Sequence, residues 1–301
     1  MWFKNLAIFS LTEDFALTPD ELEDKLKQMA FRPCGSHEEF TFGWTSPIGK
    51  SSQQLVHSSN GFMMICGKKE ERVLPSSVVN EMVQKEIDEK EESQGRKLSK
   101  KERTAIKDEV IFALLPRALT FSNKIYAYID PKGGWLIVDA ASANKAEDLL
   151  SGLRKCLGSL PAVPINTIGK PINAMTNWLL ENDCPGGIAV GDECELKSPD
   201  DDGGIVRCRR HDLWSEEITN HLEAGKQVTK LALNWDDRLS FVLDENLSVK
   251  RLRFLDLIQD QVADIDTESE AERFDVDFSI MSLELANFIP RLAELFGGVN
   301  K

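Results

Sequence analysis

The sequence predicts an α+β fold: a mixed α/β body, a projecting helical hairpin, and a C-terminal part built from an antiparallel sheet and a helix. Two observations lead to this prediction. Short strand-like segments recur in both halves of the 301-residue chain, and the pattern becomes charged and helical between residues 76 and 115. We therefore expect residues 1–75 and 116–165 to form the central body, residues 76–115 a helical tip insertion, and residues 166–301 a base domain.

The body is expected to begin with a strand and a helix. Residues 2–11 alternate loosely between apolar and polar side chains, which favours a strand. Thr18 is a good N-cap, Pro19 suits the first helical position, and Glu21 can return a hydrogen bond to the cap. A second strand is expected at residues 61–66, and the charged stretch that follows can extend it.

A charged helical stretch interrupts the body. Residues 78–115 have a helical period with a break near residues 93–95. Within them RKLSKKERTAIK, residues 96–107, holds six basic side chains against Glu102 alone. We interpret the stretch as a hairpin of two helices that projects from the body. The alternative is a solvated pair of surface helices connected by salt bridges.

The body then resumes with a hairpin and a helix. Residues 124–130 alternate, Pro-Lys-Gly-Gly forms a turn, and residues 135–139 return. A helix with a stripe of leucines is expected over residues 144–157. The two prolines of residues 160–165 favour an edge strand or a linker.

The second half is expected to combine strands with short helices. A helix is predicted at residues 172–180, and strands are predicted at residues 188–195 and 204–211. A short helix should begin at Ser215 and end at Gly225.

Three strands and a long helix complete the prediction. Residues 228–235, 238–243 and 247–254 are separated by short acidic turns, which favours antiparallel pairing. The sequence TESE from Thr267 is typical of a capping box, and residues 279–296 predict a final amphipathic helix.

The composition excludes several classes of protein. Hydrophobic residues make up 42% of the chain and charged residues 29%, which excludes wholly disordered and collagen-like chains. The 36 basic and 50 acidic side chains give a formal net charge of −14. This charge argues against a nucleic-acid binder unless the cations gather on one surface.

The cellular compartment is inferred from three features that the sequence lacks: a membrane span, a signal peptide and paired cysteines. A membrane span needs about 18 consecutive apolar residues, and no such run occurs. The apolar start of the chain is short and is interrupted by Glu13 and Asp14, so no signal peptide is expected. The six cysteines form no C-x-x-C pair, which favours reduced thiols. We expect a cytoplasmic protein without membrane contact.

The sequence gives poor signals for an enzyme. The four histidines form no H-E-x-x-H motif. The segment from Gly43 to Ser51 resembles a phosphate-binding loop, but five residues separate its glycines where the motif needs four, and neither flank fits. We therefore expect no enzymatic activity, no metal and no cofactor.

Basic residues of the second half are the strongest candidates for a binding surface. Residues 204–253 hold nine basic and eight acidic side chains. Alternate side chains of a strand share a face, so Arg207 and Arg209 should point the same way, as should Arg251 and Arg253. Such a face would bind DNA phosphates without reading bases. The alternative is the charged outer face that many antiparallel sheets have.

Long stretches of the chain resemble one protein family. These are MWFKNL, MAFRPCG, DEVIFALLPRAL, VDAASANKAEDLL, LRKCLGSLPAVP, SEEITNHLEAGKQVTKLALNWDDRLSF and FDVDFSIMSLELANFI. Together they are similar to the bacterial recombination-associated RdgC family over residues 1–298.

The resemblance implies a fold and a function. It implies a non-enzymatic DNA-binding protein of the cytoplasm and nucleoid that assembles as a ring-shaped homodimer around a basic hole. Such a protein would bind double-stranded and single-stranded DNA with little sequence preference and restrain the RecA recombinase. A ring that is acidic outside and basic inside would accommodate the net charge of −14.

The resemblance also suggests residue roles. Under this hypothesis the hole is lined by Arg207, Arg209, Arg210, Lys226, Lys230, Lys250, Arg251 and Arg253, with Lys97, Lys100 and Lys101 of the helical tip as second-rank candidates. Leu119 and Phe121 are candidates for apolar anchors of a ring-closing dimer contact, and the alternative is that both are core residues.

A different class of function stays open at this point. The chain could be a protein–protein adaptor whose acidic face acts directly on a recombination or replication protein without essential DNA binding. Salt separates the two hypotheses, because phosphate contacts weaken steeply as salt rises.

Overall fold

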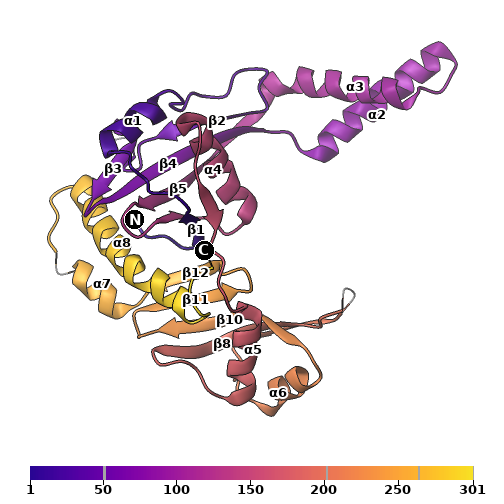
Figure 1. Ribbon diagram of the computed structural model, residues 1–301. Helices are drawn as coiled ribbons and strands as arrows, with labels where there is room; N and C mark the ends of the chain where they lie inside the picture. The colour runs from indigo at the N-terminus through magenta and orange to yellow at the C-terminus, as the bar shows by residue number, and fades with distance from the viewer. Residues whose placement is uncertain (50–51, 201–202, 264, 301) are drawn as a thin grey trace.

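The computed structural model describes residues 1–49, 52–200, 203–263 and 265–300. Within these residues the chain forms eight α-helices and two antiparallel sheets (Figure 1). The α+β class predicted from the sequence is therefore confirmed.

The larger sheet forms the body. Its strand order is β2-β4-β5-β6-β1-β7, and β3 pairs with β4. The β5–β6 pair is the predicted hairpin, and among the described residues β7 pairs with β1 alone, as expected for an edge strand. The strands are β1 (Ala7–Leu11), β2 (Phe40–Thr45), β3 (Val56–Ser59), β4 (Phe62–Val73), β5 (Leu119–Asp130), β6 (Trp135–Val138) and β7 (Ala162–Pro164).

The centre of the larger sheet is covered on both faces. On β4, Met63 and Ile65 share one core with α1 (Pro19–Lys27) and α4 (Ala143–Leu157), whereas Met64 belongs to the core on the other face. A strand buried on both faces needs apolar side chains at consecutive positions, which explains the uninterrupted run GFMMIC.

The helix α1 begins at the predicted capping box. The Thr18 hydroxyl accepts from the Glu21 N–H at 3.3 Å, and the Glu21 carboxylate accepts from the Thr18 N–H at 2.8 Å. These bonds satisfy donors that the first turn of a helix leaves without partners.

Two strands of the body were absent from the prediction, β2 and β3. Gly43 lies inside β2, where an added Cβ would come within 2.5 Å of the Phe31 backbone, so this glycine allows close packing of two chain segments. Gly43 therefore does not open a phosphate-binding loop, and the Lys50 and Ser51 of that near-motif lie outside the described residues.

The smaller sheet forms the base, with strand order β12-β11-β10-β8-β9. The helices α5 (Pro171–Glu181) and α6 (Glu216–Glu223) contribute to the core on one of its faces. The strands are β8 (Ile188–Lys197), β9 (Ile205–Arg209), β10 (Gln227–Trp235), β11 (Leu239–Asp244) and β12 (Val249–Phe254).

The C-terminal helix α8 (Glu270–Glu294) lies between the two sheets (Figure 1). Its Phe278, Met281 and Leu285 are fully buried in a core that also contains residues of both sheets. The helix is longer than predicted, and its N-cap is Ser269, whose hydroxyl accepts from the Glu272 N–H at 3.2 Å. The capping box assigned to Thr267 was thus wrong by two residues. A short helix that was not predicted, α7 (Asp256–Ala263), precedes it.

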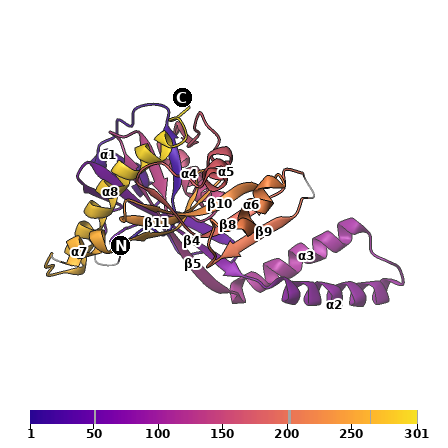
Figure 2. The same ribbon diagram turned by 90° about the horizontal axis from the view of Figure 1, so that it is seen from below.

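The predicted hairpin projects from the body (Figures 1 and 2). It consists of α2 (Ser76–Gln94) and α3 (Lys100–Leu114), and a one-turn 3-10 helix, Leu115–Arg117, leads back to β5. The two helices have a small core of their own, formed by Ile87, Leu98, Ile106 and Val110. Salt bridges also connect them, as the alternative interpretation expected.

No helix in the described part of the chain is both long enough and apolar enough to cross a membrane.

The ion pair between Arg238 of the β10–β11 turn and Glu284 of α8 gives a test of how α8 is held. Arg238 Nε donates to Glu284 Oε1 at 2.6 Å, and Glu284 is only 4% exposed. Arg238→Met should lower the free energy of unfolding by about 2–3 kcal/mol, because it leaves a buried carboxylate without its partner. Urea denaturation measures the loss.

The control is Arg291→Met, which removes an exposed pair with Glu294 on the same helix and should cost less than about 1 kcal/mol. Equal losses in the two variants would contradict the role of the buried pair.

Candidate nucleic-acid interface

The open face of the smaller sheet is the face opposite its helices, and it is polar because of strand alternation. On β8, Glu193 and Glu195 alternate with the buried Cys194 and Leu196. We define the open face by its charged residues: Glu193, Glu195, Arg207, Arg209, Lys230, Asp244, Lys250, Arg251 and Arg253. It lies away from α8, on the side toward which the hairpin projects (Figure 2).

Glu195 connects cations of two neighbouring strands. Its carboxylate accepts from Lys230 Nζ at 2.8 Å and from Arg207 Nε at 2.6 Å. Partial burial alone would raise the pKa of Glu195, but these hydrogen bonds lower it to about 2. The carboxylate therefore holds both cations on the open face at neutral pH.

Glu193, two residues before Glu195 on β8, has the same role. Arg251 Nη2 lies 2.6 Å from Glu193 Oε1, and Arg209 Nε lies 3.4 Å from the same oxygen. The hydrogen bond from Arg251 holds the pKa of Glu193 below its usual range. Arg251 has a φ of 51°, at a bulge where the β11–β12 register shifts. Positive φ is strained for a residue with a Cβ.

The predicted base cations fall into two groups. Five are held by the three carboxylates of the open face, since Lys250 Nζ also lies 2.8 Å from Asp244 Oδ2. Within the described residues Arg210, Lys226 and Arg253 have no ion-pair partner. Arg253 is exposed on β12, whereas Arg210 follows β9 and Lys226 precedes β10, so these two flank the strands.

The open face keeps an excess of positive charge. Six of the residues that define it are basic and three are acidic, and Asp192, which lines the hollow of the same face, adds a fourth carboxylate. The side chains of Arg207 and Arg209 are 65% and 72% exposed although each has a carboxylate partner. Each guanidinium group has more N–H donors than its carboxylate uses, so an anion can bind the exposed side of the arginine while the ion pair stays formed.

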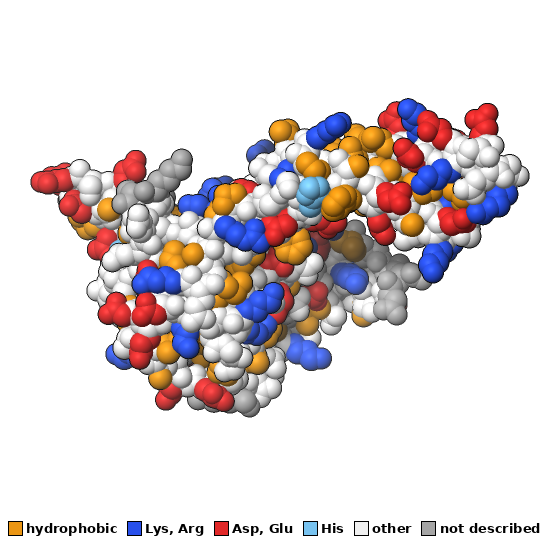
Figure 3. Space-filling view, turned by 90° about the horizontal axis from the view of Figure 1, so that it is seen from above, with side chains coloured by type: hydrophobic (Ala, Val, Ile, Leu, Met, Phe, Trp, Pro, Cys, Tyr) orange, Lys and Arg blue, Asp and Glu red, His pale blue; other side chains and the backbone are white. Residues whose placement is uncertain are grey.

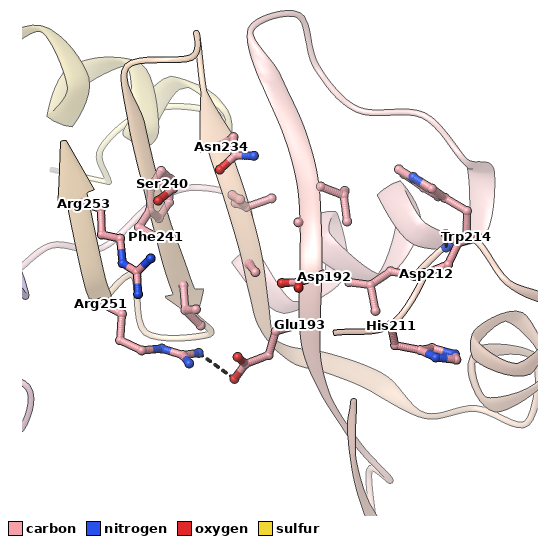
Figure 4. A pocket seen from close by; sticks show the side chains of 16 residues that line it. Asp192, Glu193, His211, Asp212, Trp214, Asn234, Ser240, Phe241, Arg251 and Arg253 are labelled. Atoms are coloured by element: carbon pink, nitrogen blue, oxygen red, sulfur yellow. Dashed lines mark hydrogen bonds and ion pairs between the residues drawn. The ribbon is translucent and has the colours of Figure 1, made fainter. Parts of the chain in front are cut away.

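The open face has a hollow of about 620 Å³. Arg251 and Arg253 stand on one side, and His211 and Trp214 stand beyond β8 on the other (Figure 4). Small side chains make the floor between them, which includes Gly191 and Ala232. Trp214 was not singled out from the sequence, because it lies in a loop without strand or helix periodicity.

A second group of cations was also missed. Lys68 of β4 and Lys124 of β5 are direct register partners, and neither has an ion-pair partner among the described residues. Like charges directly opposite each other destabilise a sheet. Here Lys68 Nζ lies 3.9 Å from the centre of the Phe31 ring, which offsets part of this cost. The two lysines come together through the register of β4 and β5, which cannot be read from the linear sequence.

The tip cations lie at the far end of the hairpin, apart from the open face of the same chain (Figure 1). Lys97 is 88% exposed and its Nζ lies 2.8 Å from Glu91. Lys100 and Lys101 are exposed in the first turn of α3, where the helix dipole disfavours positive charge.

Leu119 and Phe121 are exposed, by 81% and 52%. The alternative that they are core residues is therefore wrong. The register Val73↔Leu119, Phe40↔Glu71 and Glu71↔Phe121 places four exposed apolar side chains on one face of the body sheet. We call Phe40, Val73, Leu119 and Phe121 the apolar patch.

The apolar patch lies outside the core that the helices cover. It shares its face with α1 and α4, but none of its four residues belongs to the core of that face, and α4 pairs through Asp148 with Lys69, at 3.5 Å. Figure 3 shows hydrophobic side chains gathered where the hairpin leaves the body. Exposed apolar groups of this kind mark interaction surfaces.

The described residues contain no group of three or more His, Cys, Asp or Glu side chains that could hold a metal ion.

The low pKa of Glu195 predicts how pH affects its contribution to stability. A lowered pKa stabilises the fold above the unfolded value near 4.5, and this contribution is lost as pH falls toward about 2. Glu195→Gln should therefore lower stability by a constant amount above about pH 5, and the difference from the wild type should shrink as pH falls. Urea denaturation between pH 7 and pH 2.5 measures this.

Glu223→Gln, which changes an exposed carboxylate of α6, is the matched control and should show no such trend. A difference for Glu195→Gln that is independent of pH would contradict the ion-pair account.

Comparisons with known proteins cover nearly the whole chain. The family model described as "Putative exonuclease, RdgC" matches residues 1–299. The chain is 49% identical over 298 residues to a protein of Tolumonas auensis, with 99% of each chain covered. It is 47% identical to proteins of Aeromonas hydrophila and Yersinia pestis, covering 99% of this chain and 98% of each relative. All three relatives carry the name recombination-associated protein RdgC.

Proposed function

The chain belongs to the RdgC family and has a role in recombination, and from this premise we propose that it is a non-sequence-specific DNA-binding protein. It encircles DNA as a homodimeric ring and restrains RecA-dependent homologous recombination. It acts in the cytoplasm on the nucleoid, without catalysis. The observation that carries the proposal is the excess of exposed cations on the open face of an otherwise acidic chain.

The open face is suited to phosphates. Arg207 and Lys230 are positioned by Glu195, so little side-chain entropy is lost when a phosphate oxygen binds the N–H donors that the carboxylate leaves free. Guanidinium groups bind phosphate through bidentate hydrogen bonds. Contacts of this kind fix a protein on DNA without reading its sequence.

The negative net charge of the chain favours enclosure of DNA by a ring over tight binding of DNA to the protein surface. A chain of −14 is repelled by DNA over most of its surface, whereas the open face, the lysines of the hairpin and the Lys68–Lys124 pair of β4 and β5 attract it. Lys97, Lys100 and Lys101 would add contacts from the tip. In a closed ring, topology would retain the DNA even where these contacts are weak.

The apolar patch supports the dimer. Leu119 and Phe121 would be covered by a second copy of the chain, which removes exposed apolar area from water. A ring also explains how recombination is restrained, because DNA inside the ring is withheld from the recombinase.

Charge reversal on β9 tests the DNA contact. Arg207→Glu with Arg209→Glu should weaken duplex binding by at least 100-fold, since it replaces two attractions by two repulsions. For the wild type, the logarithm of the binding constant should fall with the logarithm of salt at about −0.9 per phosphate contacted. Fluorescence anisotropy on one duplex across a salt series measures both, and RecA strand exchange should lose its inhibition in the same variant.

The control is Lys25→Glu with Lys155→Glu, the same change of charge on α1 and α4, which should leave duplex binding within a few-fold of wild type.

A nuclease assay tests the non-catalytic role. End-labelled duplex incubated with the protein and Mg²⁺ should stay intact. Absence of duplex binding by the wild type at low salt would reject the proposal in favour of the acidic adaptor, and release of nucleotides would reject the non-catalytic role.

A charge in the apolar patch tests the dimer. Leu119→Glu should convert a dimer into a monomer in sedimentation equilibrium, because it places a carboxylate in a desolvated contact. Leu283→Glu, at an apolar side chain of α8 that is 48% exposed, is the control and should remain dimeric. An unchanged dimer in Leu119→Glu would remove the apolar patch from the interface.

A further inference from the structure

The hollow on the open face has the composition of a nucleotide site. It combines a large aromatic side chain, two arginines and a floor of small and polar residues, with three carboxylates, Asp192, Glu193 and Asp212, also in its lining. Its volume lies within the range of small-ligand sites. Phosphate contacts alone need no hollow, because a duplex backbone rests on a surface. The hollow is therefore not explained by non-specific duplex binding.

Trp214 forms one wall. It is 39% exposed, although tryptophan is among the side chains that gain most from burial. Its backbone N–H donates to Asp212 Oδ1 at 3.0 Å, which fixes the turn that carries it. Figure 4 shows the indole directed back toward β8, across the hollow from the arginines. An indole exposed in this way offers a surface on which a base can stack.

Arg251 and Arg253 form the opposite wall. Arg253 is exposed and has no ion-pair partner within the described residues. Arg251 is held over the hollow by Glu193, and its φ of 51° is a local strain at a residue that is not glycine. Strained residues of this kind concentrate at binding sites. The two guanidinium groups are placed to take phosphates on either side of a bound base.

The floor provides depth and hydrogen-bonding groups. An added Cβ at Gly191 would come within 3.0 Å of the Ala232 Cβ, so small residues at both positions keep the floor low. Asp192, Asn234 and Ser240 line the hollow between the two walls. Carboxylate, amide and hydroxyl oxygens accept hydrogen bonds from the amino groups of cytosine, adenine and guanine.

We propose that the hollow between Trp214 and the Arg251–Arg253 wall binds one unstacked nucleotide of single-stranded DNA, with the base on the indole and its phosphates on the arginines. The inference rests on the proposed function, since it assigns a substrate class to part of the same face. It implies two modes of DNA binding on one surface. A duplex contacts the arginines through its phosphate backbone, whereas a single strand also inserts a base into the hollow. Duplex bases are stacked and paired, so they cannot reach Trp214 without being extruded.

Substitution of Trp214 tests this inference. Trp214→Ala should weaken binding of a single-stranded oligonucleotide by roughly 5- to 150-fold, the range for loss of one stacked base. Binding of a duplex of the same length should change less than two-fold. Trp214→Phe keeps an aromatic surface and should recover most of the single-strand affinity. Fluorescence anisotropy gives the affinities, and a 2-aminopurine within the single strand should lose fluorescence on binding to wild type but not to Trp214→Ala.

Leu283→Ala, which removes an exposed apolar side chain near the middle of α8, is the matched control and should affect neither substrate. Circular dichroism and the melting temperature show whether Trp214→Ala folds. If it does not, the nucleotide site is tested by the single-strand affinity of Trp214→Phe and by the loss of 2-aminopurine fluorescence on binding to the wild type. Equal weakening for single strand and duplex, or unchanged single-strand binding, would overturn the nucleotide site while leaving the proposed function standing. A wild type that binds no duplex would overturn the proposed function itself.

Discussion

Burial of α8 between the two sheets is the constraint on which the rest of the structure depends. Phe278, Met281 and Leu285 pack in a core shared by the body and the base, so the helix joins the two sheets into one unit. The buried Glu284 is neutralised by Arg238 of the base, and the amino group of Met1 pairs with Asp277 on the same helix. Because α8 fills one side of the smaller sheet, the other face is left open on the side where the hairpin projects (Figure 2).

The carboxylates of the open face organise its cations. Glu193 and Glu195 hold four basic side chains from three other strands at fixed positions, which a face of cations alone would not do because they repel one another. The three carboxylates lower the net charge of the open face, and contacts with DNA then depend on the N–H donors that the exposed guanidinium groups keep free. Such a surface suits a protein that holds many sequences weakly and relies on closure of a ring for retention.

Local features of the sequence predicted the elements well, and non-local contacts account for most of what was missed. The capping box at Thr18 and the turn at Gly95, with its φ of 63°, are local, and both were predicted within a few residues. For α8, a Thr and a Ser two residues apart both had an acidic residue three positions later, and only the fold selects Ser269. The strand β2 was overlooked although Phe40, Phe42 and Trp44 alternate, because its charged and Gly-rich flanks obscured the pattern.

In the candidate site, too, local patterns were predicted and non-local contacts were missed. Alternation placed Arg207 and Arg209 on one face, but the count over 204–253 left out β8, so the pairing with Glu193 and Glu195 was missed. The Lys68–Lys124 pair and the hollow beside Trp214 arise from register and from a loop that packs against a sheet, and neither leaves a linear pattern. Exposure of Leu119 and Phe121 depends on which part of the sheet α1 and α4 cover, which is a property of the fold.

Retention of circular DNA at high salt tests the central claim, enclosure of DNA by a ring, most directly. The protein is loaded at low salt on one duplex, either covalently closed or linearised, and the salt is then raised. The account predicts that linear DNA is released as phosphate contacts weaken, whereas circular DNA stays bound until it is cut. Release of both forms at the same salt concentration would contradict enclosure and leave only surface binding.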